Sequence, residues 1–102
     1  MTNRVSTSGT DITLYGEMTI YHAAALKEAI GAAVAQIHGN WHVHLSEVTE
    51  LDTAGVQLLL GLREYARQRA CELRFVQPSA MVREVLELLQ IPSLDQAVEG
   101  QS

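Results

Sequence analysis

The sequence has few of the features that mark secreted, membrane-spanning or nucleic-acid-binding proteins. Its one cysteine, Cys71, has no partner for a disulfide within the chain. No apolar run approaches the ~20 residues that cross a bilayer, and the N-terminus shows no signal-peptide pattern. Lys and Arg number 7 against 12 acids and form no cluster, which argues against a nucleic-acid or anionic-membrane partner. We therefore expect a cytoplasmic protein.

The composition predicts one packed domain. The chain has 102 residues, of which 47% are hydrophobic and 19% are charged, so it can bury a core and is not typical of a disordered protein. No internal repeat, linker or low-complexity segment divides it. We expect residues 1–102 to form a single domain.

Hydrophobic periodicity predicts strands that alternate with helices. A period of two indicates strands at residues 12–18, 41–45 and 71–76, and a turn at residues 8–11 could add a short strand near Val5. A helical period indicates helices at residues 21–38, at about 54–69, and from an N-cap at Ser79 to a stop at Pro92. Residues 46–50 are predicted to be a polar loop. Strands separated by long helices favour parallel pairing through right-handed crossovers.

The second predicted helix is apolar nearly all round in its first half. The segment "VQLLLGL" has few positions that suit water, so it must be covered on most sides. We expect Leu59 and Leu60 to be among the least exposed residues of the chain.

The stretch "LDTAG" at the start of that helix is the main candidate site. Asp52 precedes the helix, so its side chain can accept hydrogen bonds from the unpaired amides of the first turn. Taken alone, this is a helix N-cap. Thr53 offers a second interpretation, since an exposed hydroxyl beside these amides could meet a partner or carry a phosphate.

Two histidines alternate on the second strand and so share one face. His42 and His44 suggest a metal, but a stable zinc site needs three or four ligands, and neither His22 nor His38 has a spacing that joins them. We predict no metal site. His44 could instead lie under the start of the Asp52 helix and tune it electrostatically, or it could be an ordinary half-exposed strand residue.

No pattern of a catalytic site is present. The sequence has no GxxxxGK[ST] phosphate loop, GxSxG elbow or HExxH helix. Cys71 opens a strand without a second cysteine nearby, which is typical of a packing residue. We predict neither an enzyme nor a bound cofactor.

The order of these segments resembles a known family. "GEMTIYHAAALKEAI", "LSEVTELDTAGVQLLL" and "LRFVQPSAMVREVLELL" are similar to the STAS domain of anti-sigma factor antagonists and of sulfate-transporter tails, over about residues 11–91. The resemblance implies a mixed α/β sheet of four to five strands covered by three to four helices. It also implies a partner-binding surface around the loop of Asp52, Thr53, Ala54 and Gly55, with Thr19 and His44 at neighbouring positions.

The chain departs from the family pattern at several of these positions. Phosphorylated antagonists carry Asp-Ser-Ser-Gly with the second serine as acceptor, and Ala54 stands there in this chain. Thr53 takes the first hydroxyl position, as in some stressosome and lipid-transport relatives. Thr19 and His44 each stand where the family often has aspartate, and the closing strand and last helix are shortened to "IPSLDQAV".

The resemblance supports two functions. The first is a non-catalytic bacterial signalling adaptor that binds a regulatory protein through the Asp52-Thr53 loop and the following helix. Its partner would be an anti-sigma factor with a kinase-like ATPase fold, acting in transcription regulation, or a chemosensory kinase system. The second is the small cytosolic STAS subunit of a phospholipid ABC transporter, which also uses an Asp-Thr-x-Gly loop. The sequence leaves the oligomeric state open.

Overall fold

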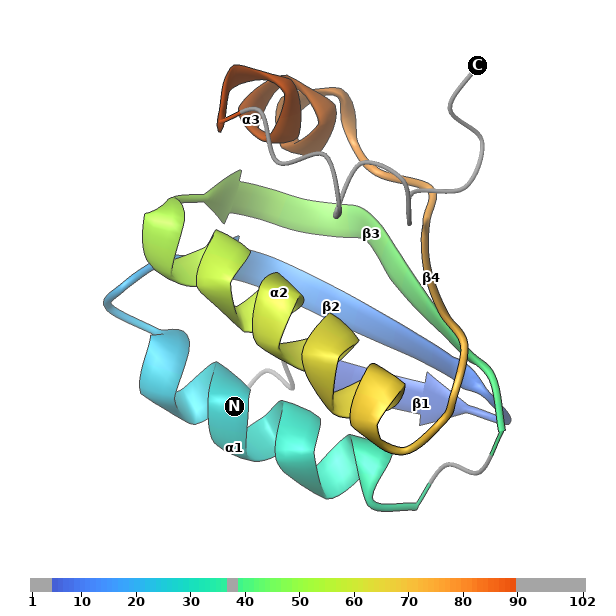
Figure 1. Cartoon of the computed structure of the whole chain (residues 1–102). Coiled ribbons are helices and arrows are strands. Elements are labelled where there is room, and N and C mark those ends of the chain that lie inside the picture. Colours follow the sequence, from blue (N-terminus) through green and yellow to red (C-terminus); the bar gives the residue numbers. More distant parts are fainter. Residues whose placement is uncertain (1–4, 37–38, 90–102) are drawn as a thin grey trace.

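Within the residues that the structure describes, the chain forms an α/β domain with a four-stranded sheet and three helices. A computed structural model describes residues 5–36 and 39–89, and Figure 1 shows its arrangement. In chain order the elements are β1 (Val5–Ser8), β2 (Asp11–Met18), α1 (Ala23–Val34), β3 (Trp41–Leu51), α2 (Thr53–Gln68), β4 (Leu73–Val76) and α3 (Ala80–Leu89). The predicted positions of Pro92, His38 and the "IPSLDQAV" segment lie outside the described residues.

The sheet is mixed, and its strands lie in chain order, β1-β2-β3-β4. β1 pairs antiparallel with β2 through a tight turn, at which Gly9 has a φ of +63°. β3 pairs in parallel with both β2 and β4. The predicted parallel neighbours are confirmed, as is the short strand near Val5.

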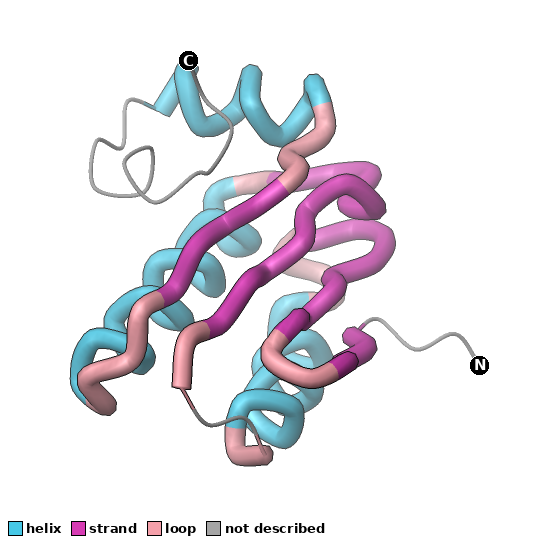
Figure 2. The backbone as a smooth tube through the Cα atoms, turned by 90° about the vertical axis from the view of Figure 1, so that its right-hand side faces the viewer, coloured by secondary structure: helices cyan, strands magenta, loops and turns pink. Residues whose placement is uncertain are grey.

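α1 and α2 lie side by side on one face of the sheet, and α3 lies near the end of β3 (Figures 1 and 2). Alternation places Ile12, Leu14, Trp41, Val43 and Leu45 in the core, each with no exposed surface. The apolar stripes of the helices close this core from the other side, and Leu26, Ile30 and Leu59 are among its members. The layer order follows from the periods of the sequence.

Packing in α2 differs in one position from the expectation. Leu59 has no exposed surface, as predicted, whereas Leu60 is only partly buried against the edge of the core. Residues 59 and 60 point about 100° apart on a helix, and only one of them can face the sheet fully. The prediction for Leu60 was too strong.

The prediction of a loop at residues 46–50 is wrong. β3 runs through it to Leu51, and the strand pairs with β2 as far as the Met18–Leu51 position. Register shifts interrupt the pairing between Thr13 and Tyr15 and again between Gly16 and Glu17, and each shift adds one residue on β3. These irregularities allow Ser46 and Glu47 to be exposed while Val48 stays buried.

The extension of β3 is what positions the start of α2. It carries the chain to the carboxyl end of β2 before α2 begins, so both strands end at the same edge of the sheet. The β2–α1 connection and the β3–α2 connection therefore meet at that edge.

Candidate functional site

Asp52 joins the two connections. Its Oδ1 accepts a hydrogen bond of 3.0 Å from the backbone N–H of Gly55, which is the N-cap contact expected from the sequence. Its Oδ2 accepts a second bond of 3.0 Å from the backbone N–H of Ile20, in the β2–α1 connection. The Asp52 backbone N–H also donates to the carbonyl oxygen of Met18 at 3.2 Å. One side chain thus starts a helix and fixes the neighbouring loop.

These amides favour the ionised form of Asp52. Hydrogen bonds from the backbone of Ile20, then of Gly55, lower the pKa of the Asp52 carboxyl below its ordinary value. A lowered folded-state pKa means that the stabilisation is complete above the ordinary pKa and is lost as the pH falls through the folded value.

Two substitutions test this role. We expect Asp52→Ala to lower the melting temperature at pH 7 by roughly 4–8 °C, since it removes both hydrogen bonds. Asp52→Asn keeps a capping oxygen without the charge, so its deficit relative to the parent should shrink as the pH falls below about 4. Melting curves from pH 3 to pH 7 provide the measurement, and a deficit for Asp52→Asn that is constant over this range would contradict the assignment.

Thr53 is the first residue of α2 and is exposed to solvent. Ala54, next to it, is partly exposed. In its first turn α2 presents backbone amides that lack partners within the helix, so negative charge and hydrogen-bond acceptors are favoured there. Thr53 is therefore an exposed residue at a helix start that favours acceptors and negative charge.

Gly55 has a different role from the one that its place in the loop suggested. It is buried, and Met18 of β2 and Leu51 of β3 fill the space where a side chain would lie. A Cβ at this position would overlap the carbonyl oxygen of Met18 and would lie 2.8 Å from Cδ1 of Leu51. The glycine lets α2 approach the sheet closely, so it supports the loop from beneath.

The β2–α1 connection contributes surface that the sequence analysis missed. Ile20 is 68% exposed and Tyr21 is 90% exposed, and the Ile20 amide is bound by Asp52. Thr19 precedes them and is partly buried. Its backbone carbonyl oxygen accepts a hydrogen bond of 2.9 Å from the His22 N–H, which closes a turn. The signal was the apolar pair "IY" between a strand and a helix, where polar turn residues are usual.

His44 does not belong to this site. Its ring nitrogens lie 3.1 Å from Oδ1 of Asp11 and 3.2 Å from Oε1 of Gln77. It pairs with Thr13 across the sheet, five residues before Met18, and Met18 pairs with Leu51 at the end of β3. His44 is therefore about 17 Å along the sheet from that end. The expected electrostatic influence of His44 on the start of α2 is therefore wrong, because β3 continues beyond residue 45.

The remaining candidates from the sequence were a metal site and a reactive cysteine. Within residues 5–36 and 39–89, no three His, Cys, Asp or Glu side chains gather as a metal site would require. Cys71 is partly buried, and its Sγ lies 3.6 Å from the carbonyl oxygen of Arg69. None of the helices in the same residues is long and apolar enough to cross a bilayer.

Comparison with known proteins identifies both a family and a fold. A family model described as "Mlab, STAS domain" matches residues 1–98. The solved structure of the anti-sigma factor antagonist SpoIIAA in its unphosphorylated form is 20% identical, with a TM-score of 0.72 over 96% of this chain and 86% of that chain. The phosphorylated form of SpoIIAA, a Bacillus cell fate determinant, is 19% identical, with a TM-score of 0.68 over 96% and 89%. No curated protein matches the sequence.

Proposed function

The chain belongs to the STAS domain family, and from that premise we propose that it is a cytosolic bacterial signalling adaptor without catalytic activity. It would bind a regulatory protein through the Thr53 surface, which we define as the exposed residues Ile20, Tyr21 and Thr53 with the partly exposed Ala54. The start of α2 lies within this surface.

The observation that carries the proposal is the double hydrogen bond of Asp52. Because the carboxylate binds the amides of both Ile20 and Gly55, it fixes the two exposed segments relative to each other. A large apolar side chain and an aromatic ring, exposed in a loop that is bound to the start of a helix, are typical of a protein contact. Preorganisation of this kind lowers the conformational entropy that is lost when a partner binds.

The fold match supports a proposal for the class of partner. SpoIIAA, whose fold this chain shares, is named as an anti-sigma factor antagonist. A partner of the anti-sigma type, with a kinase-like ATPase fold, is accordingly the first candidate, and a chemosensory kinase system is the second. In this chain Ala54 replaces the usual phosphoacceptor, so we propose that Thr53 acts mainly as a neutral contact.

The loop sequence favours one alternative function. The loop formed by Asp52, Thr53 and Gly55 resembles the Asp-Thr-x-Gly loop of the small STAS subunit of a phospholipid ABC transporter. The same Thr53 surface would then bind the ATPase subunit of the transporter. This alternative changes the identity of the partner and leaves the binding residues the same.

Affinity capture from the source cell separates these functions. The parent protein and a Thr53→Glu protein would be used in parallel, and partners captured by the parent alone would be identified by mass spectrometry. An anti-sigma factor or a chemosensory kinase would support the adaptor, whereas an ABC ATPase would support the transporter subunit. Identical captured proteins from both baits would contradict binding at the Thr53 surface.

A further inference from the structure

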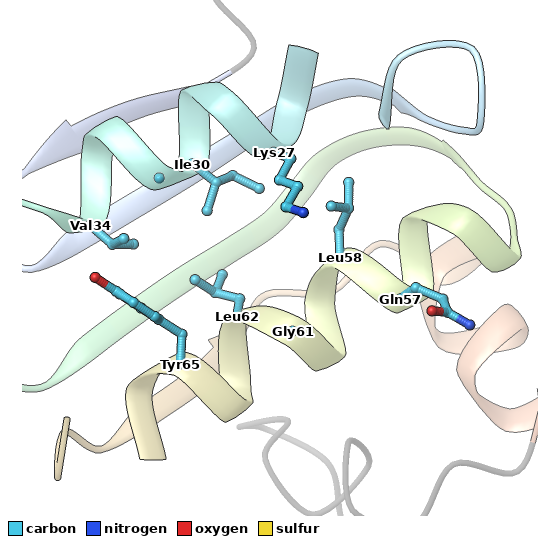
Figure 3. Close-up of a pocket in the computed structure, with 9 residues that line it drawn as sticks. Lys27, Ile30, Val34, Gln57, Leu58, Gly61, Leu62 and Tyr65 are labelled. Atoms are coloured by element: carbon cyan, nitrogen blue, oxygen red, sulfur yellow. The ribbon is translucent and has the colours of Figure 1, made fainter. Parts of the chain in front are cut away.

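A groove of about 490 Å³ separates α1 from α2, on the helical side of the molecule (Figure 3). Its walls are mainly apolar and come from both helices, and they include Lys27, Ile30, Val34, Leu58, Leu62 and Tyr65. Pockets of this size, apolar with a few polar groups, are typical of small-molecule sites. Neither Thr53 nor Tyr21 lines this groove.

Two glycines keep the groove open. Gly31 lies on α1 and Gly61 lies on α2, and a Cβ at either position would meet no atom within 4 Å. Glycine in the interior of a helix is unfavourable relative to alanine, and local packing does not require it here. A side chain at either glycine would instead occupy the groove.

The groove is elongated and has a positive charge on one side. Its lining runs from Lys27 to Val34 on α1 and from Gln57 to Tyr65 on α2, which corresponds to a length of about 10–12 Å. The Lys27 side chain extends from α1 toward α2 (Figure 3), and among the described residues it forms no salt bridge. The Tyr65 hydroxyl accepts a bond of 2.8 Å from Arg69 Nη1, which adds a second cation near the other end.

We propose that this groove binds an unbranched amphipathic carboxylate, such as a fatty acid of medium length. The chain of the ligand would lie along Ile30, Leu58 and Leu62, where it replaces contact of these side chains with water. Its carboxylate would pair with the ammonium group of Lys27 at the edge of the groove, where both charges stay partly hydrated. A neutral chain of the same length would bind more weakly, since it lacks the ion pair.

The protein contains its own reporter for this binding. Trp41 is the only tryptophan, and its ring lies 6.0 Å from the Tyr65 ring, centroid to centroid. Tyr65 lines the groove, so a ligand that moves Tyr65 should change the fluorescence of Trp41. Isothermal titration calorimetry gives an independent measure of the same event.

The experiment titrates sodium decanoate, below its micelle concentration, into the full chain. Gly61→Leu fills the groove and improves helix propensity, so we expect it to fold and to bind decanoate roughly tenfold more weakly or worse. Lys27→Gln should weaken the binding of decanoate several-fold and leave the binding of decanol unchanged. Ala32→Leu, which adds bulk on an exposed position of α1 outside the lining, is the matched control and should bind as the parent does.

Thr53→Glu should also bind decanoate as the parent does, so the result is independent of the proposed partner surface. Saturable binding to the parent that is lost in Gly61→Leu would support the proposal. Absence of saturable decanoate binding, or equal binding by the parent and Gly61→Leu, would overturn it. Equal loss in Lys27→Gln for decanoate and decanol would overturn the role assigned to the ammonium group.

Discussion

Thr53→Glu is expected to weaken binding of the identified partner by roughly 100-fold or more, because an unpaired charge would be buried in the contact. Thr53 is exposed, so the free protein gains no buried charge from this substitution. An acid in the first turn of a helix is also tolerated or mildly favourable. The melting temperature should therefore stay within roughly 3 °C of that of the parent.

Three variants separate the charge from the other effects of the change. Thr53→Ser keeps the hydroxyl and should bind nearly as well as the parent, while Thr53→Val keeps the shape and reports the hydrogen bond alone. Thr7→Glu introduces the same charge at an exposed position of β1 and should bind normally. Tight binding by Thr53→Glu, measured by calorimetry with the purified partner, would show that the Asp52-Thr53 segment is only a helix cap.

Gly55→Ala is expected to be strongly destabilising and to lower the free energy of unfolding by about 3 kcal/mol or more. The added Cβ would overlap the carbonyl oxygen of Met18, which belongs to the backbone of β2 and cannot rotate away. Either α2 must move off the sheet or β2 must bend, and both changes disturb the fully buried side chain of Leu59. Partner binding should fall together with folding.

Gly61→Ala is the matched control for this prediction. It lies in the same helix, and a Cβ there would meet no atom within 4 Å, so the substitution should stabilise the protein by up to ~1 kcal/mol through helix propensity. Urea unfolding of both variants gives the comparison. If Gly55→Ala proved as stable as the parent, the close approach of α2 to β2 described above would be incorrect.

The sequence predicts the layers of this fold because the periods of its apolar residues are simple. The alternation in β2 and in residues 41–45 identifies the buried face of the sheet, and the helical stripes containing Leu26 and Leu59 identify the faces that cover it. The N-cap at Ser79 is also confirmed, since its Oγ accepts a bond of 3.3 Å from the Val82 N–H. These features depend on local sequence alone.

The features that were missed depend on contacts between distant segments. The irregular register of β3 against β2 breaks the alternation, so residues 46–50 have the pattern of a loop although they form a strand. The prediction for His44 failed for the same reason. The second hydrogen bond of Asp52 and the burial of Gly55 both involve residues of the β2–α1 edge that lie more than thirty positions earlier in the chain.

The candidate site was therefore predicted only in part. Asp52 and Thr53 were found from the helix start, but Ile20 and Tyr21 were not, because their proximity to Asp52 arises from the parallel pairing of β2 with β3. An exposed apolar pair in a loop carries a signal only when the fold shows what lies beside it.

Site-specific photo-cross-linking at Tyr21 tests the central claim most directly. A photoreactive phenylalanine analogue would replace Tyr21, which is 90% exposed next to the Asp52-bound loop, and in a control it would replace Tyr15, on the opposite face of β2 from the helices. We predict a cross-link to the captured regulatory partner from position 21, its loss when Thr53→Glu is added, and none from position 15. A partner cross-linked from position 15 and not from position 21 would contradict binding at the Thr53 surface.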